Sequence, residues 1–258
     1  MKQYINNFLK YRSLLYELAA RDVKIKYRKS VLGIFWSILN PLLMMTIMSI
    51  VFSNLFKFDV ENYPVYILSG QVIFNFFNEA TSGCLTAILG NSALIKKVYI
   101  PKYLFVLSRI TSSLINLLST FCALIIVMIC TRSELHYTTF LVPIPLIFLS
   151  IFSLGIGLIL AAATVKFRDV MHFYSVFTTG LMYLTPVIYP IESLPSPIYE
   201  IVRINPLTSM LMMFRNAIKY DAMPGTLNLV IAAVSAFSAL IIGLYVFYKQ
   251  QDTFILNI

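Results

Sequence analysis

The sequence predicts an all-α integral membrane protein with six transmembrane helices and both ends of the chain in the cytoplasm. Hydrophobic residues make up 59% of the 258 residues and charged residues only 12%, whereas a soluble domain carries about 25% charged residues. The mean hydropathy is +0.82. The basic residues behind the net charge of +9 gather in short gaps between long apolar runs. That pattern is typical of a membrane protein and argues against a nucleic-acid partner.

Six apolar stretches have, or nearly have, the length of about 20 residues that crosses a hydrocarbon core about 30 Å thick. They comprise residues 34–56, 66–89, 104–130, 142–165, 173–189 and 227–248. The fifth stretch is short and contains Pro186, so we expect its outer end to bend. The chain 1–258 then forms a single transmembrane domain, divided into an interfacial helix (1–33), spans one to five (34–189), an external segment (191–224) and span six (227–248).

The distribution of charge predicts the orientation of these spans. If the N-terminus is inside, fifteen of the twenty Lys and Arg residues lie in cytoplasmic segments. The other five lie outside: Lys57, Arg132, Arg203, Arg215 and Lys219. Cytoplasmic segments carry the excess of basic residues in membrane proteins. We therefore expect both termini to be cytoplasmic.

Residues 1–33 predict a helix that lies along the membrane surface. Tyrosine and aliphatic residues share one half of a helical wheel and basic residues occupy most of the other half. Arg12, Asp22 and Lys26 interrupt the apolar side. A basic amphipathic helix of this kind binds in the membrane interface and does not cross it. The alternative is a solvated, partly disordered tail.

The external segment 191–224 predicts two short helices. Pro206 can occupy the first turn of a helix, and residues 207–214 are apolar but too short to span a membrane. We expect these helices to lie at the outer leaflet or to dip into it. They form either a structured cap over something in the membrane or a plain connector.

No motif in the sequence supplies catalytic chemistry. GxxxxGK[ST], HExxH and GxSxG patterns are absent, as is an aspartate cluster that would hold a metal diphosphate. Cys84, Cys122 and Cys130 fall inside apolar runs, and His136 and His172 lie at opposite membrane faces. We therefore expect no catalytic residues, no metal and no cofactor in this chain. It has the organisation of a transport pathway without an energy source of its own.

Glu79 is the one ionisable residue that the sequence places well inside a span. A carboxylate in a membrane is by default a functional candidate. A neutral or hydrogen-bonded structural role beside Asn75 and Asn78 explains it equally well. An ion-coupled carrier usually needs more such groups, and no inverted repeat is evident in the sequence.

Several short stretches resemble one known family. They are RKSVLGIFWSILNP at 28–41, GNSALIKKVYIPK at 90–102, FRD at 167–169, TPVIYP at 185–190 and the Asn205-Pro206 pair. Each is weak alone, but their order and spacing are similar to those of the transmembrane permease subunits of bacterial polysaccharide ABC exporters. These permeases export O-antigen, capsule or teichoic acid. The resemblance runs along nearly the whole chain.

The resemblance implies a homodimer in the cytoplasmic membrane of a bacterium, enclosing a channel for a lipid-linked polysaccharide. It also implies two nucleotide-binding ATPase subunits on the cytoplasmic face, which would bind ATP and Mg. Short gate helices would correspond to the segment 191–224. The alternatives are an ABC exporter permease for a drug or lipid and, from another class, an ion-coupled carrier or a membrane-embedded enzyme.

Site residues follow from the same resemblance and from the chemistry of sugars. A coupling helix would correspond to residues 91–101, with Leu94, Ile95, Lys96, Lys97 and Tyr99 as contacts to the ATPase subunit. Arg28 and Trp36 would lie where the interfacial helix meets the first span and the substrate enters. Because sugar rings stack on aromatic rings, Phe74, Phe76, Phe77, Tyr183 and Tyr189 are candidate pathway residues. Glu79 joins them as the carboxylate within a span.

Overall fold

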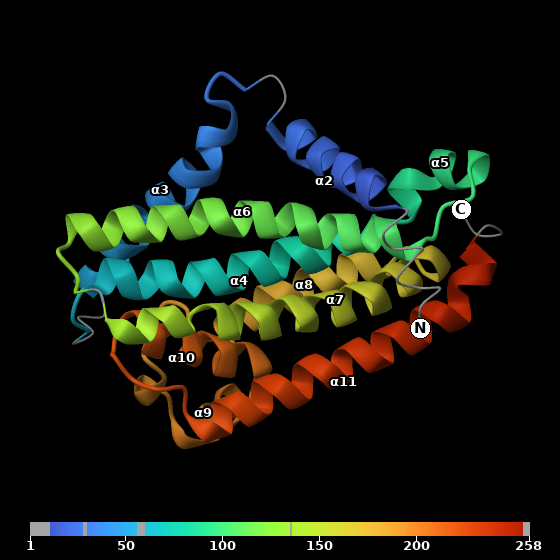
Figure 1. The fold of residues 1–258 in the computed structure, drawn as a ribbon. Helices are drawn as coiled ribbons and strands as arrows, with labels where there is room; N and C mark the ends of the chain where they lie inside the picture. Colours follow the sequence, from blue (N-terminus) through green and yellow to red (C-terminus); the bar gives the residue numbers. More distant parts are fainter. Residues whose placement is uncertain (1–10, 28–29, 56–59, 135, 255–258) are drawn as a thin grey trace.

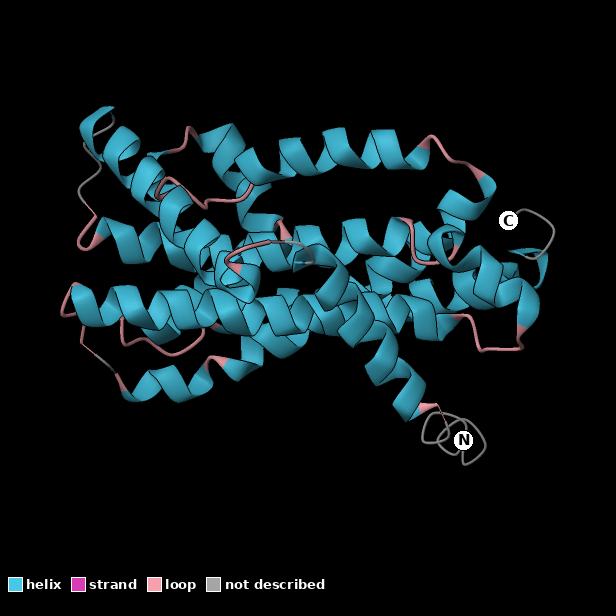
Figure 2. Ribbon diagram, turned by 90° about the horizontal axis from the view of Figure 1, so that it is seen from above, coloured by secondary structure: helices cyan, strands magenta, loops and turns pink. Residues whose placement is uncertain are grey.

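The computed structural model describes residues 11–27, 30–55, 60–134 and 136–254, and within these ranges the chain contains helices and no strand. Figure 2 shows helices joined by short loops. The α-helices are α2 (Arg12–Tyr27), α3 (Trp36–Leu55), α4 (Tyr63–Leu85), α5 (Ser92–Lys97), α6 (Tyr103–Cys130), α7 (Pro143–Lys166), α8 (Val170–Tyr183), α9 (Ser196–Ile204), α10 (Pro206–Ile218) and α11 (Thr226–Gln250). Short 3-10 turns occupy Gly33–Phe35, Leu89–Asn91, Tyr137–Leu141, Ile191–Ser193 and Gln251–Thr253.

The long helices α4, α6, α7 and α11 run lengthwise along one bundle (Figure 1). One end of this bundle carries α5, the start of α2 and the end of α11, and is called here the α5 end (Figure 1). The opposite end carries α9 and α10 and is called the α10 end (Figure 1). On one side of the bundle, α2 and α3 form an inverted V.

Helices α7 and α11 make the closest pairing in the bundle. A Cβ atom added to Gly155 of α7 would lie 2.3 Å from the backbone carbonyl carbon of Ala239 in α11. A Cβ atom on Gly243 would lie 2.3 Å from the carbonyl oxygen of Gly155. Small residues permit such an approach of two backbones, which is how helices in membranes gain packing without a hydrophobic driving force.

Among the described residues, three helical stretches are long and apolar enough to cross a membrane: Tyr103–Cys130, Tyr137–Lys166 and Thr226–Thr253. A fourth is a bent pair, Tyr63–Leu85 with Leu89–Lys97, which meet at 56°. The all-helical membrane class is thus confirmed. Helices also form at the first and fifth predicted spans, but α3 has a shorter apolar part and α8 has only 14 residues. The count of six spans and the orientation stay predictions.

The described part of the predicted interfacial helix is α2, and it is attached to the bundle. Residues 1–10 and Arg28 lie outside the described residues, and α2 packs against α6 with Leu18 and Ala19 buried. The residues that interrupt its apolar side include Asp22, which is buried. Asp22 thus belongs to the contact of α2 with the bundle, and the position of this helix at the membrane surface stays a prediction.

The region after α8 contains the two short helices that the sequence predicts. The sequence predicts that the fifth span, residues 173–189, bends at Pro186. Helix α8 instead ends at Tyr183, and residues 184–190 form an irregular segment. Helix α10 packs against α4, α7 and α11, and most of its side chains are buried. It is part of the core at the α10 end.

Candidate functional site

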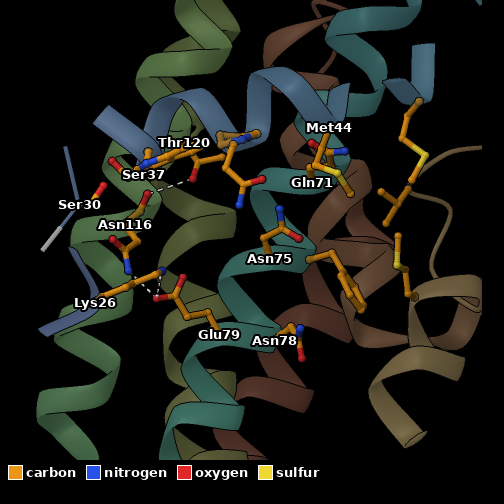
Figure 3. A pocket seen from close by; sticks show the side chains of 17 residues that line it. Lys26, Ser30, Ser37, Met44, Gln71, Asn75, Asn78, Glu79, Asn116 and Thr120 are labelled. Atoms are coloured by element: carbon orange, nitrogen blue, oxygen red, sulfur yellow. Dashed lines mark hydrogen bonds and ion pairs between the residues drawn. The ribbon is translucent and has the colours of Figure 1, made fainter. Parts of the chain in front are cut away.

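A cavity of about 560 Å³ lies between α3, α4 and α6 (Figure 3). Its lining is rich in side-chain amides, which are the five residues Asn40, Gln71, Asn75, Asn78 and Asn116. The other lining residues are Lys26, Ser30, Trp36, Ser37, Pro41, Met44, Met48, Phe74, Glu79, Thr120, Met182 and Val187. We call this the amide cavity.

Helical spacing brings three of the amides to one face of α4. Residues three and four positions apart share a face of an α-helix, and Gln71, Asn75 and Asn78 of α4 follow that spacing. On α3, Ser37, Asn40 and Met44 do the same. These two sets of residues on neighbouring helices therefore line the amide cavity, and α6 adds Asn116 and Thr120 to the lining.

An ion pair connects α2 to this cavity. The ammonium nitrogen of Lys26 lies 2.9 Å from Oε1 of Glu79. Asn116 donates a hydrogen bond from Nδ2 to the same oxygen (Figure 3). The sequence suggested Asn75 and Asn78 as the neighbours of Glu79, but its partners come from α2 and α6. Lys26 and Asn116 are distant from Glu79 in the chain, so only the fold brings them to it.

The chemistry of the amide cavity suits a neutral, hydroxyl-rich ligand. An amide offers both donors and an acceptor, as the hydroxyls of a sugar do. Gln71 is 6% exposed, and its Oε1 has no hydrogen-bond partner among the described residues. A buried acceptor without a partner is costly, so an incoming hydroxyl would gain by donating to it. Trp36 and Phe74 add ring faces to the same lining.

A second polar cluster ties α2 to the α5 end. The buried carboxylate of Asp22 lies 3.1 Å from Nη2 of Arg21 and 3.1 Å from Nη1 of Arg109 on α6. Arg21 also donates to Oδ1 of Asn91 at 2.9 Å, and Nδ2 of Asn91 donates to the carbonyl of Ala87 at 2.8 Å. We call Arg21, Asp22, Asn91 and Arg109 the α2 cluster. Through it, the turn just before α5 is joined to α2.

Sequence reasoning missed the α2 cluster. The available signal was the interruption of the apolar side of residues 1–33 by Asp22 and Lys26. Each interruption is explained by a partner on the bundle, namely Arg109 for Asp22 and Glu79 for Lys26. Arg109 also shows that Glu79 is not the only ionisable residue within a long helix, because it lies in α6.

The predicted coupling residues divide into two groups. Ile95 is only 8% exposed and belongs to the core cluster, against which Leu94 also packs. Lys96 and Lys97 are exposed, and Tyr99 is 91% exposed. The six-residue helix α5 thus packs on the core through Leu94 and Ile95 and exposes Lys96 and Lys97, and the exposed Tyr99 lies just beyond its end.

The predicted pathway residues are similarly separated by the fold. Phe74 and Glu79 line the amide cavity, as does Trp36 from the first span. Phe76 and Phe77 are buried in the core, and Phe77 stacks on Phe152 with ring centroids 5.7 Å apart. At the end of α8 the Tyr183 side chain is exposed, and the Tyr189 hydroxyl donates to the Tyr183 carbonyl. The structure therefore brings only some of them to one site.

Comparisons with known proteins give a consistent result. The sequence pattern of the family described as "ABC-2 type transporter" matches residues 13–219. An O-antigen export system permease protein RfbA from Klebsiella pneumoniae is 28% identical over 246 residues, which cover 93% of each chain. An RfbA from Myxococcus xanthus is 27% identical over 86% of this chain and 85% of its own. A polysialic acid transport protein KpsM from Escherichia coli is 22% identical over 91% of this chain and 92% of its own.

Proposed function

We infer that this chain, which belongs to the ABC-2 type transporter family, is the channel-forming permease of an ATP-driven exporter for a polysaccharide. The observation that carries the inference is similarity over nearly the full length to relatives named for O-antigen export and polysialic acid transport. The amide cavity supports it, because side-chain amides and ring faces suit sugar hydroxyls and C–H surfaces. A permease for drugs or lipids has less support.

The assembly that we propose follows the family. Two copies would form the channel in the cytoplasmic membrane, with six spans each and both termini inside. Two ATPase subunits would bind ATP and Mg at the α5 end, and the substrate would be a lipid-linked glycan. Helices α9 and α10 would serve as gate helices on the outer side. This arrangement places the exposed Lys96, Lys97 and Tyr99 toward the ATPase subunit.

The α2 cluster suggests how a partner's movement would reach the amide cavity. A shift of the turn at Leu89–Asn91 would act on Arg21 through Asn91. Arg21 and Lys26 lie on the same helix, and Lys26 contacts Glu79 in the cavity. Because a helix is stiff over one or two turns, displacement at one contact would move the other. Thus α2 would connect ATP-driven motion to the pathway.

Reconstitution tests the proposed function directly. The purified chain alone should hydrolyse no ATP above background, and proteoliposomes should export a lipid-linked glycan only after the cognate ATPase subunit and ATP are added. Robust hydrolysis by the chain alone would contradict the proposal. So would glycan transport driven by a pH gradient without the ATPase subunit.

A further inference from the structure

Arg215 of α10 is the largest fully buried side chain of the described residues, at 1% exposure, and it contacts both α4 and the segment after α8. Its Nη1 donates to the Pro186 carbonyl at 2.6 Å and its Nη2 to the Val187 carbonyl at 2.9 Å. Nη2 also donates to the Tyr66 carbonyl at 3.1 Å, and Nε to the Ser69 hydroxyl at 3.3 Å. The guanidinium lies 3.5 Å from the centre of the Tyr66 ring.

Two tyrosines of α4 extend the same pattern. The Tyr63 hydroxyl donates to the Ile188 carbonyl at 2.7 Å, and the Tyr66 hydroxyl donates to the Tyr189 carbonyl at 2.8 Å. The carbonyls of four consecutive residues, 186–189, are therefore all held by side chains from α10 and α4. We call Arg215, Tyr63 and Tyr66 with these carbonyls the carbonyl clamp.

Asn205 fixes the beginning of the same segment. Its Nδ2 donates to the Leu184 carbonyl at 3.1 Å and to the Thr185 hydroxyl at 3.2 Å. Its Oδ1 accepts from the backbone N–H of Leu207 at 3.0 Å and so caps α10. An irregular segment has no helical partners for its backbone carbonyls, and here α4 and α10 supply them.

The charge of Arg215 makes this arrangement unusual. None of the carboxylates in the described ranges forms a salt bridge with it. Burial lowers the pKa of Arg215, yet an arginine in a protein stays protonated. A buried cation without a carboxylate is expensive unless its donors are satisfied. A neutral side chain could pack this core at lower cost, which indicates that the position of the 186–189 segment matters.

The clamped segment also forms part of the amide cavity, because Val187 lines it together with Met182 from the end of α8. Val187 contacts Arg215 beside Gly70 of α4, whereas Glu79 lies nine residues further along α4. At 1.5 Å per residue this separation is about 13 Å. Val187 therefore belongs to the end of the cavity nearest α10, and the Lys26–Glu79 pair belongs to the opposite end.

We propose that Arg215 is a positioning residue for transport that holds Val187 in place and thereby closes the amide cavity toward the α10 end. The proposal rests on the proposed function, because it treats the cavity as part of the export pathway. With the clamp formed, α4, the 184–190 segment and α10 are one unit and the cavity end is shut. Loosening the clamp should open the cavity to the outside without the ATPase subunit.

Thiol accessibility tests this closure. Cys84, Cys122 and Cys130 would first be replaced by alanine, and Val187→Cys introduced as the reporter. Arg215→Lys keeps the charge but loses the fork that reaches Pro186, Val187 and Tyr66 together. In intact cells we expect it to raise the rate of labelling by a membrane-impermeant maleimide about tenfold, because the segment opens locally more often. Ser196→Cys on α9 gives the reference rate for reagent access.

A second variant leaves Arg215 unchanged. In Gly70→Ala, the added Cβ would lie 2.8 Å from the Val187 carbonyl oxygen and 2.9 Å from Nη2 of Arg215, so the clamp must shift. Gly83→Ala on the same helix is the matched control, because its nearest neighbour is Cδ of Arg109 at an ordinary 3.6 Å. Labelling of Val187→Cys should rise in the first variant and stay unchanged in the second.

The outcomes separate closure from mere stability and from the proposed function. A residue that only stabilises the fold would lower the amount of protein without changing the labelling of Val187→Cys relative to Ser196→Cys. Unchanged labelling in folded Arg215→Lys and Gly70→Ala protein would overturn the proposal. If the Arg215→Lys protein does not accumulate, the comparison of Gly70→Ala with Gly83→Ala still shows whether the carbonyl clamp closes the cavity. Labelling needs neither ATP nor glycan. If labelling of Val187→Cys rises in these variants but the reconstituted protein exports no glycan, closure by Arg215 is supported and the proposed export function is rejected.

Discussion

The two ends of the amide cavity are held by different kinds of contact. Toward the α5 end, α2 is joined by ion pairs in which at least one member is partly exposed, such as Lys26 and Glu79 with side-chain exposures of 46% and 36%. At the α10 end, a fully buried arginine donates to neutral backbone carbonyls. Exposed ion pairs exchange with water at little cost, whereas a buried cation cannot leave its acceptors cheaply. We therefore expect the first end to move with a partner and the second to resist movement.

From this contrast we expect the largest loss of stability when Arg215 is replaced. Replacing it by methionine leaves the Pro186 and Val187 carbonyls without these donors inside the core, whereas the Tyr66 carbonyl still accepts from the Ser69 hydroxyl. We expect the free energy of unfolding to fall by about 3 kcal/mol or more, because each buried carbonyl that loses its donor is costly. Thermal unfolding in detergent, followed by size-exclusion chromatography, measures this. Stability equal to that of Lys26→Met would remove the distinction between the two ends.

We expect the second largest loss of stability from a change at Asp22, which makes the strongest contact at the α5 end. Asp22→Asn removes the buried charge that Arg21 and Arg109 share. Because both arginines keep some access to water, we expect a loss of about 2 kcal/mol, less than for a fully buried pair. ATP-driven export should fall further than stability does. Asp169→Asn, an exposed carboxylate in the α7–α8 connection, serves as the control. Unimpaired export in Asp22→Asn would exclude α2 as the connection.

Tyr99 should affect the partner and leave the fold intact. Because its ring is almost wholly exposed, Tyr99→Asp should insert and unfold like the unmodified protein. We expect its affinity for the ATPase subunit to fall about tenfold, the loss typical of an aromatic interface residue. Pull-down with the ATPase subunit measures it. Ile95→Asp is the contrasting variant, since a charge in the core should lower stability first. If Tyr99→Asp binds the ATPase subunit as tightly as the unmodified protein does, Tyr99 is not part of the interface.

Glu79 should give the smallest effect. Glu79→Gln can still accept from Lys26 and Asn116, and an exposed pair of this kind contributes less than about 1 kcal/mol. Most ATP-driven export should therefore remain. Glu79→Lys places two ammonium groups together and should perform worse, while the exchange Lys26→Glu with Glu79→Lys should recover activity. If Glu79→Gln were as inactive as Glu79→Lys with the ATPase subunit still bound, a proton-coupled mechanism would be favoured.

Much of the fold could be predicted from local patterns. Apolar runs located the helices, Pro206 marked the start of α10, and the short polar stretch between the second and third spans contained α5. These features depend on composition and on neighbours within one or two turns. The burial of α10 could not be predicted in this way, because it depends on packing against α4, α7 and α11, and on the Arg215 contacts to distant α4.

The candidate site was only partly predictable. Family resemblance singled out the coupling segment and Trp36, and the position of Glu79 within a span singled out that carboxylate. The affinity of sugars for aromatic rings selected Phe74, but it also selected Phe76 and Phe77, which the core buries. The amides of the cavity were not singled out, since Gln71 and Asn116 become neighbours of one space only when α4 and α6 pack. A helix shows which residues share a face, and only packing shows what that face meets.

By itself, the sequence determined that this protein folds in a membrane, that it is helical and which charged residues need partners. A long apolar run is favourable in hydrocarbon only as a helix that satisfies its own backbone, so composition was sufficient for that much. The tertiary structure alone decided which charge met which partner: Asp22 with Arg109, Lys26 with Glu79, and Arg215 with carbonyls and no carboxylate. A desolvated charge is stabilised only by groups within a few ångströms. Which groups those are depends on how helices distant in the chain come together.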